Sequence, residues 1–269
     1  MKIAGVILAA GKGTRMKSDL PKVLHSVLGK PMITYGQNAI KHLNNKYVVV
    51  GHQSDLVIKE LANEFKPVIQ EEQLGTGHAV LTLLNSNEFK NDDSEYIVII
   101  PGDAPLLLKE NIDTLISEST KRNVALGIIT AEVTNPSGYG RIIKDGNTIS
   151  KIVEEADSSE AEQKINEINS GMYCFNKNFL LENIKMLDSN NEQNEIYLTD
   201  LIEIAFQNKL DTVIVQVSED TIKGVNSMSQ LNEVETSLRE ELITSHMENG
   251  VYFQDPTSTY IDKGVVIKP

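Results

Sequence analysis

The sequence lacks the features of several protein classes. It contains a single cysteine, Cys174, which excludes a disulfide framework and a cysteine-based metal site. Its longest apolar runs, such as residues 6–10 and 97–100, have the length of strands and are too short to cross a membrane. The N-terminus runs directly into such a strand without the charged and apolar regions of a secretory signal. We therefore expect a cytoplasmic protein without a membrane span.

Basic residues are also scarce. The 269 residues contain 25 lysines and arginines against 38 aspartates and glutamates, which gives a net charge of −13. This balance argues against a nucleic-acid partner, because such proteins present a basic surface. Six of the basic residues nevertheless lie within residues 1–30, where Asp19 is the only acid. A positive segment on an acidic protein predicts a small anionic ligand, although chance clustering on a solvated face would give the same count.

What is present is the pattern of an α/β protein. Apolar runs of strand length alternate with segments of helical period, and this alternation predicts a mostly parallel sheet covered by helices on both faces. The strands are expected at residues 3–10, 46–51, 67–70, 96–101, 124–131 and 212–217. The helices are expected from Pro31, from a Ser54 cap to Ala62, and at residues 77–85 and 109–120. The length suits one large domain or one domain with an appendage.

The pattern changes after Asn135. Short strands are predicted at residues 141–144, 149–153 and 169–176, around an acidic helical segment at 154–165. We interpret them as an insertion that encloses one side of a site. Ser227 then caps a long amphipathic helix, whose stripe is predicted to pack on the core or to lead to another module. The stripe consists of Leu231, Val234, Leu238 and Leu242.

The last residues show a different sequence pattern. Ile261 and Ile267 stand six residues apart with Gly264 and Val265 between them, as in one coil of a hexapeptide β-helix. A single coil cannot bury its own core and needs neighbouring coils. We therefore expect the chain to be a fragment of a longer protein.

The first strand leads into a loop suited to phosphate. Small residues at the end of a buried strand, here Leu8, Ala9, Ala10 and Gly11, let backbone N–H groups approach a ligand at the carboxyl edge of the sheet. The spacing is not that of a Walker loop, and Met16 stands where the dinucleotide fingerprint has its third glycine. A tight turn would account for the glycines alone.

Three basic residues in and after this loop favour a triphosphate. Lys12 and Arg15 belong to the loop, and Lys22 follows Pro21, which fixes the backbone before it.

The run from Leu8 to Met16, followed by residues 20–24, resembles the signature of nucleotide-sugar pyrophosphorylases. More narrowly, the chain resembles the uridylyltransferase half of the bacterial bifunctional N-acetylglucosamine-1-phosphate uridylyltransferase and glucosamine-1-phosphate N-acetyltransferase family. Supporting stretches occur in the family's order at residues 70–78, 102–103, 138–141, 152–155, 167–171, 195–200 and 224–226. The resemblance implies a Rossmann-like nucleotidyltransferase fold with a mixed, mostly parallel sheet over residues 1–226. A linker helix at 227–250 and the truncated start of a left-handed β-helix at 251–269 would follow.

The resemblance also implies a reaction. UTP and N-acetylglucosamine-1-phosphate would give UDP-N-acetylglucosamine, a peptidoglycan precursor, and pyrophosphate, with Mg²⁺ as cofactor. Arg15 and Lys22 would be catalytic, and Asp103 and Asn226 would bind the metal, since carboxylate and amide oxygens suit magnesium. The implied substrate-binding residues are Leu8, Ala9, Ala10, Gly11, Lys22, Gln70, Gln73, Gly75, Thr76, Gly102, Asp103, Gly140, Glu154, Asn169 and Asn226.

Within this set, Gln70 and Gln73 would read the uracil, with Gly75 and Thr76 holding the base. The sugar would be bound by Gly140, Glu154 and Asn169. The sequence departs from the family's usual residues at Pro101, Ala104, Asn194 and Ile196, which lie beside these positions.

Two alternatives remain open. One is a thymidylyl- or cytidylyltransferase that acts on another phosphate, and the other is a non-catalytic sensor of nucleotide sugars. The stretches 70–76 and 154–169 argue against the first, and the intact Arg15, Lys22, Asp103 and Asn226 against the second. The full-length parent is expected to transfer acetyl groups and to form a homotrimer through its β-helix. The present chain is expected to do neither and to be a monomer.

Overall fold

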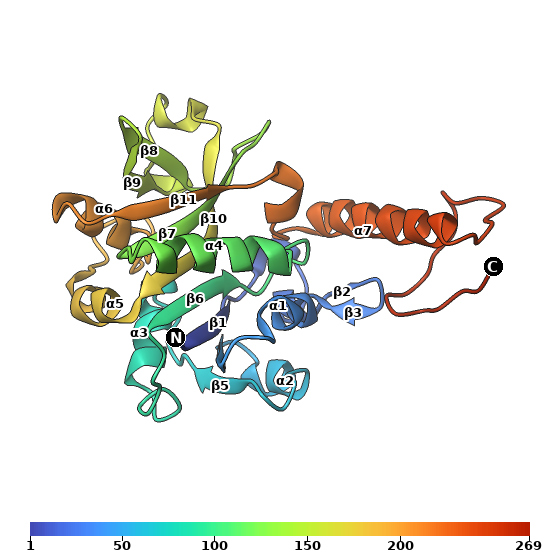
Figure 1. Ribbon diagram of the computed structural model, residues 1–269, viewed down its shortest axis with the longest axis horizontal. Coiled ribbons are helices and arrows are strands. Elements are labelled where there is room, and N and C mark those ends of the chain that lie inside the picture. The colour runs from blue at the N-terminus through green and yellow to red at the C-terminus, as the bar shows by residue number, and fades with distance from the viewer.

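A sheet of nine strands runs through the protein, as seen in a computed structural model that describes residues 1–269 (Figure 1). Its main path has the strand order β11-β7-β10-β6-β1-β4-β5, and β8 and β9 extend from β10. The strands are β1 (Ile3–Ala9), β4 (Asn45–Val50), β5 (Lys66–Ile69), β6 (Tyr96–Pro101), β7 (Leu126–Glu132), β8 (Arg141–Asp145), β9 (Thr148–Val153), β10 (Glu167–Asn176) and β11 (Thr212–Gln216).

The sheet is mixed, as predicted. β1 pairs in parallel with β4 and β6, β4 with β5, and β11 with β7, whereas β10 runs antiparallel to β6, β7 and β8. β8 and β9 form an antiparallel pair. Cys174 lies in the middle of β10, where it pairs with Val98 and Gly127 and is fully buried. The single thiol is therefore in the centre of the sheet.

Seven α-helices accompany the sheet, and its two faces bury separate apolar cores. The helices are α1 (Met32–Ile40), α2 (Ser54–Lys59), α3 (Thr76–Asn85), α4 (Lys109–Lys121), α5 (Lys177–Asn183), α6 (Asp200–Gln207) and α7 (Met228–Glu248). Ile7 packs with residues of α1 and α4 on one face, and its neighbour Val6 packs with α3, α5 and α6 on the other. Alternate strand residues point to opposite faces, so a strand buried on both faces must be apolar throughout.

Most predicted elements are confirmed to within two residues at each end. The elements that differ from the prediction are short. The helices α5 and α6 and the hairpin of β2 (Ser26–Val27) and β3 (Lys30–Pro31) were not predicted. Residues 154–165 form two 3₁₀ turns, η3 (Glu155–Asp157) and η4 (Glu162–Lys164), and not the predicted helix. That segment offers little apolar surface to pack, and its closely spaced acids repel one another in a helix.

Two helix starts also differ from the prediction. Gln53, in a left-handed conformation, takes the cap position of α2, and Ser54 is the first helical residue without a cap bond. Pro31 immediately precedes α1 and does not lie in its first turn.

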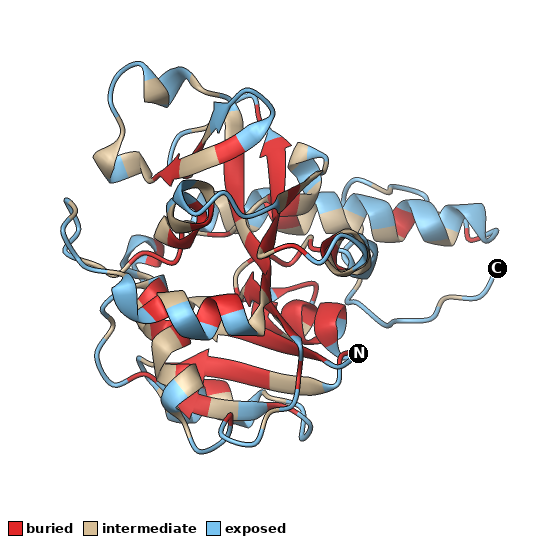
Figure 2. Ribbon diagram, turned by 60° about the vertical axis from the view of Figure 1, so that its left-hand side comes forward, coloured by how far each residue is buried: buried red, intermediate tan, exposed pale blue.

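The long helix α7 begins as predicted. The Ser227 hydroxyl accepts a hydrogen bond from the Gln230 N–H, which is an N-terminal cap. Val234 is buried, and Leu231, Leu238 and Leu242 pack around it against a third apolar cluster that includes Met16 and Met32. The stripe from Leu231 to Leu242 is therefore core packing along one side of the helix, while the other sides of α7 are mostly exposed where it projects from the body (Figure 2).

Residues 251–269 contain no strand, so the predicted start of a β-helix is not formed. The segment turns back, and Lys263 N–H donates to the Leu28 carbonyl (3.0 Å) while its ammonium lies 4.2 Å from the centre of the Tyr35 ring. A β-helical coil bonds to the coils above and below it, and without them Val266 remains 82% exposed. The division of the chain into domains at residue 226 stays a prediction.

No helix in the structure combines the length and the apolar character that a membrane crossing requires.

Candidate active site

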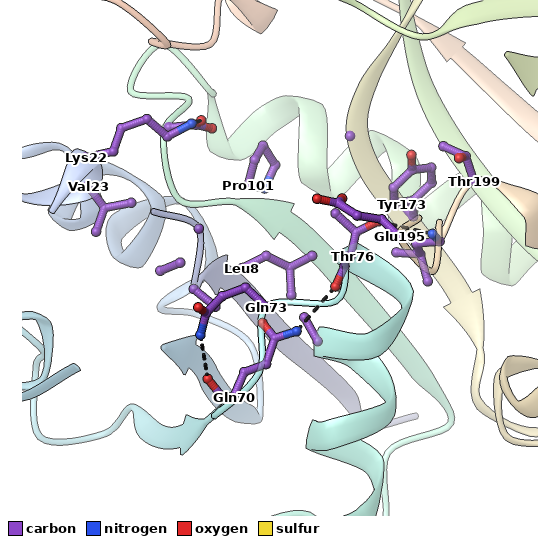
Figure 3. A pocket seen from close by; sticks show the side chains of 18 of the residues that line it. Leu8, Lys22, Val23, Gln70, Gln73, Thr76, Pro101, Tyr173, Glu195 and Thr199 are labelled. Carbon is purple, nitrogen blue, oxygen red and sulfur yellow. Dashed lines mark hydrogen bonds and ion pairs between the residues drawn. The ribbon is translucent and has the colours of Figure 1, made fainter. Parts of the chain in front are cut away.

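A cleft opens at the carboxyl ends of β1 and β6, beside the bulge of β10. Its cavity volume is about 310 Å³, within the range of small-molecule sites. Figure 3 shows Lys22 at one end, Tyr173, Glu195 and Thr199 at the other, and two glutamines on the wall between them. Predicted residues that line the cleft are Leu8, Ala9, Ala10, Gly11, Lys22, Gln70, Gln73, Gly75, Thr76, Asp103, Glu154 and Asn169.

The glycine-rich loop is shaped by Gly13 and anchored by Met16. Gly13 has a left-handed φ of 60°, and a Cβ at this position would lie 2.7 Å from Lys22 Cβ. Glycine is thus needed both for the backbone angle and for the close approach to Lys22. Met16, at the end of the short turn η1 (Thr14–Met16), is 2% exposed and belongs to the third apolar cluster. This accounts for an apolar residue where a dinucleotide loop has glycine.

Four predicted residues from distant segments meet beside this loop, and we call them the basic end: Arg15, Lys22, Asp103 and Asn226. The Lys22 ammonium contacts the Asp103 carboxylate and donates to Asn226 Oδ1 (3.0 Å). Arg15 donates to the same Asn226 oxygen (2.9 Å). The side chains of Lys22 and Asp103 are only 17% and 16% exposed, so this pair lies in a partly dehydrated environment. Two cations and two oxygen donors therefore share one small volume.

The donor set of the basic end fits magnesium that arrives with phosphate. The Asp103 carboxylate and the Asn226 amide oxygen both contact the same Lys22 nitrogen, so they are close enough to bind one cation. Both are hard oxygen ligands, but two protein ligands leave most of an octahedral shell to phosphate and water. The structure holds no cluster of three or more histidine, cysteine or acidic side chains that could bind a metal by itself. The metal role of these residues stays a prediction.

Residues 70–76, which we call the glutamine loop, form the wall of the cleft after β5. Gln70 is only 2% exposed, and its Nε2 donates to the Gly75 carbonyl (3.3 Å) and lies 2.9 Å from His78 Nδ1. Gln73 Nε2 donates to the carbonyls of Gln70 (3.0 Å) and Glu71 (3.2 Å). The loop is therefore closed by its own amide side chains.

A backbone seam joins the glutamine loop to the segment before α6. Ile196 N–H donates to the Leu74 carbonyl (2.7 Å), and its own carbonyl accepts from Gly77 N–H (2.8 Å). Gly75, with φ of 107°, faces this seam, and a Cβ here would lie 2.5 Å from the Ile196 oxygen. Ile196, one of the departures from the family pattern, thus contributes mainly through its backbone.

The opposite end of the cleft, which we call the acidic end, contains Glu154, Asn169, Glu195 and Thr199. Glu154 follows β9 and accepts from the Thr199 hydroxyl (3.0 Å). Burial raises the pKa of Glu154, the Thr199 bond partly offsets this, and the nearby Asp200, Asp157 and Glu195 raise the pKa further. Asn169 donates from its backbone to the Gly140 carbonyl (2.9 Å) and from its side chain to the Tyr173 hydroxyl (2.7 Å).

Four predicted residues lie next to the cleft but do not line it: Arg15, Gly102, Gly140 and Asn226. Gly102 N–H bonds to the Leu8 carbonyl (2.9 Å) and ties β1 to β6. A Cβ at Gly140 would lie 3.2 Å from a Glu154 oxygen, so glycine keeps room there.

Three further polar residues line the cleft without a role predicted from the sequence: Thr199, Glu195 and Tyr173. Thr199 and Glu195 fall within a stretch, residues 195–200, that the resemblance had singled out. Tyr173 had no such signal, because it reads as an ordinary apolar residue of a buried strand.

Strand order, glycine-rich loop and charged cleft together define a nucleotidyltransferase. A family of that description, nucleotidyl transferase, matches residues 4–221, and the chain belongs to it. Within the family the chain is similar to the bifunctional protein GlmU. It is 45% identical to that of Clostridium novyi, over 98% of this chain and 58% of the relative, and 41% identical to that of Alkaliphilus metalliredigens, over 99% and 59%.

These matches confirm the resemblance to the uridylyltransferase half of the bifunctional family. The chain spans a little under three fifths of the length of these relatives.

Solved structures show the same fold at low sequence identity. A putative glucose-1-phosphate thymidylyltransferase from Bacillus anthracis superposes with a TM-score of 0.68 at 19% identity, over 95% of this chain and 98% of that one. An inositol-1-phosphate CTP transferase from T. maritima gives a TM-score of 0.65 at 18% identity, over 93% and 98%. Because identity is below a fifth in both, these likenesses concern the fold alone.

Proposed function

We propose that the protein transfers a uridylyl group from UTP to N-acetylglucosamine-1-phosphate, which yields UDP-N-acetylglucosamine for peptidoglycan synthesis and releases pyrophosphate. The observation that carries the proposal is a single cleft with the basic end on one side, the acidic end on the other and the glutamine loop between them. The identity of 45% to a GlmU protein supports this substrate pair over other sugar phosphates.

The chemistry needs positioning and charge neutralisation. A phosphate oxygen of the sugar phosphate attacks the α-phosphorus of UTP, and the bond to the pyrophosphate oxygen breaks. The phosphate nucleophile is already anionic near neutral pH, so no general base is required. The obstacle is the repulsion between two anions, and Lys22 and Arg15 reduce it from fixed positions at the edge of the sheet.

Asp103 and Asn226 would hold Mg²⁺ in this scheme. When bound, the ion supplies further neutralisation of the phosphates. Lys22 bridges the same two oxygens in this structure, so its ammonium is held beside the proposed metal ligands. Val225 N–H donates to the Asp103 carbonyl (2.9 Å), which fixes the two ligand-bearing segments against each other.

Different parts of the cleft would bind the nucleotide and the sugar. Backbone groups of residues 8–11 take the nucleotide phosphates and ribose, and Gln70 with Thr76 takes the base. Glu154 accepts from sugar hydroxyls, while Asn169 can both donate and accept. Gly140 lets the backbone come close to the sugar.

The test is pyrophosphate release from a panel of four nucleoside triphosphates and several sugar phosphates, each with and without Mg²⁺. We expect the highest kcat/KM with UTP and N-acetylglucosamine-1-phosphate together, and no turnover without Mg²⁺. A preference for dTTP or CTP with another sugar phosphate would replace the proposed reaction. Tight binding of UDP-N-acetylglucosamine without pyrophosphate release at any Mg²⁺ level would indicate a sensor.

A metal titration tests the ligand assignment separately. Asp103→Ala should lose most of its activity, and its residual activity should show a changed Mg²⁺ dependence; an unchanged titration curve would remove Asp103 from the metal site.

The second activity of the bifunctional family is proposed for the part of those proteins that this chain does not match, as is the homotrimer. Coenzyme A release from acetyl-CoA and glucosamine-1-phosphate by the 269-residue chain would overturn this assignment.

A further inference from the structure

We infer that His78 is a positioning residue that fixes which hydrogen-bonding group Gln70 presents to the base. The inference rests on the proposed function, because it assumes that a nucleobase occupies the glutamine loop. His78 lies in the first turn of α3, and its Nδ1 is 2.9 Å from Gln70 Nε2. No other side chain bonds to the Gln70 amide.

The orientation of the Gln70 amide follows from its partners. The Gly75 carbonyl lies 3.3 Å from one end of the amide and can only accept, so the amide must turn its nitrogen toward it. The same nitrogen then donates its second hydrogen to His78 Nδ1. That ring nitrogen must therefore be unprotonated, and the neutral imidazole carries its proton on Nε2.

Both N–H groups of Gln70 are thereby used inside the protein, which leaves Oε1. No protein donor bonds to this oxygen, and it is not among the side-chain atoms sealed from solvent without a partner. Gln70 lines the cleft, so its free group there is a hydrogen-bond acceptor. The Nε2 group of Gln73 is likewise used by two loop carbonyls and offers the cleft no further donor.

An acceptor at this position selects between pyrimidines. Uracil and thymine carry a donor, N3–H, where cytosine carries an unprotonated, accepting N3. Oε1 would bond to the first two and repel the third. If the amide turned over, Oε1 would face the Gly75 carbonyl, and a bond to His78 would require the imidazole proton to move from Nε2 to Nδ1. Without the His78 acceptor, only the longer Gly75 contact (3.3 Å against 2.9 Å) would hold the amide in its present orientation.

The test compares two replacements of similar size. His78→Leu removes the acceptor, whereas His78→Asn keeps an oxygen bonded to Cγ, the position of Nδ1 in histidine. We expect the UTP:CTP ratio of kcat/KM to fall roughly tenfold in the leucine variant, the effect of one net hydrogen bond, and to stay within about twofold in the asparagine variant. Equal losses with UTP and CTP, or the same loss of ratio in both variants, would show a merely structural role and overturn the inference.

A spectroscopic measurement separates this inference from the proposed function. In the nucleotide-free protein at neutral pH, the ¹⁵N shifts of the His78 ring should show an unprotonated Nδ1 and a protonated Nε2. A protonated Nδ1 would overturn the inference whatever the substrate. If the protein prefers dTTP, the proposed reaction fails while the dTTP:CTP ratio still tests His78. A wild-type preference for CTP would overturn both.

Discussion

The basic end and the acidic end of the cleft are built in different ways. Arg15 and Lys22 of the basic end belong to one short run, and their loop follows directly from the central strand β1. The acidic end is assembled from β9, the bulge of β10 and the segment before α6. The basic end pairs opposite charges, whereas the acidic end gathers carboxylates, and burial raises the pKa of Glu154 there.

This difference shows how the cleft can recognise phosphates and a sugar in separate ways. Phosphates are the same in every nucleotide, and a contiguous loop at a sheet edge is sufficient for them. A sugar differs from other sugars by the positions of its hydroxyl groups, which requires several side chains fixed from different directions. The two ends should therefore respond differently to substitution, the basic end in turnover and the acidic end in substrate affinity.

The largest effect is expected at the basic end. Lys22→Ala and Arg15→Ala should each lower kcat on the order of 10²–10³-fold, because each removes a fixed positive charge from the reacting phosphates. Initial rates of pyrophosphate release measure this, and thermal unfolding checks that the variants remain folded. Lys30→Ala, in the same basic segment but outside the cleft, is the matched control and should keep normal turnover. Near-normal kcat in Lys22→Ala would contradict the assignment.

A substitution at the seam should affect the glutamine loop and the acidic end together. Gly75→Ala puts a methyl group 2.5 Å from the Ile196 oxygen and strains a positive φ, and we expect it to destabilise the fold by about 1–3 kcal/mol. The KM values of both substrates should rise. Gly138→Ala is the control, because Gly138 also has a positive φ but no atom within 4 Å of its added methyl group. Equal denaturation midpoints for the two variants would mean that the seam carries no strain of its own.

The pH dependence of sugar-phosphate affinity tests the acidic end. Burial raises the pKa of Glu154, so its carboxylate fraction, and with it the affinity for sugar hydroxyls, should fall as pH decreases through that raised pKa. Glu154→Gln should raise the KM for N-acetylglucosamine-1-phosphate roughly tenfold at neutral pH, leave the KM for UTP unchanged, and flatten the pH dependence that remains after correction for the phosphate itself. An identical pH profile in wild type and variant would remove Glu154 from the sugar site.

The smallest effect concerns stability near the acidic end. Burial, followed by the charges of Glu203, Asp188 and Asp157, raises the pKa of Asp200 from 3.8 to about 6. These effects outweigh the start of α6, which would favour the charged form. Because the folded state holds this proton more tightly, the wild type loses stability as pH rises from about 4 to about 6. Asp200→Asn should not show this loss.

At pH 7 this variant should be more stable than the wild type by about 1 kcal/mol, since solvent screening of a half-exposed group reduces the full effect of the shift. Urea denaturation at pH 4 and pH 7 measures the difference. Glu182→Gln, an exposed acid on α5, should show none. A stability gap that is the same at both pH values would exclude Asp200 as its cause.

The same contrast explains what could be predicted from the sequence. The loop at residues 8–16 and Lys22 were predictable because their spacing is local. That Asp103 meets Asn226 could be expected only from the family resemblance, since 122 residues separate the two segments along the chain. Thr199 lacked an assigned role because it acts through a bond to Glu154 that depends on the whole fold.

Other parts of the fold could not be predicted for physical reasons. α5 and α6 are seven and eight residues long, so each offers only about two turns of helical pattern. Residues 261–267 have the sequence of a β-helical coil, but that structure requires neighbouring coils and the pattern does not supply them.

The alkylation rate of Cys174 can measure transient opening of the protein core. The Cys174 thiol is buried in the apolar core that the sheet shares with α4, burial raises its pKa to about 12, and no other thiol competes with it. An alkylating reagent can reach it only when this core opens, so the labelling rate measures these rare openings under native conditions. Because the sequence has no tryptophan, this rate is a convenient measure of how far a bound nucleotide holds the sheet closed.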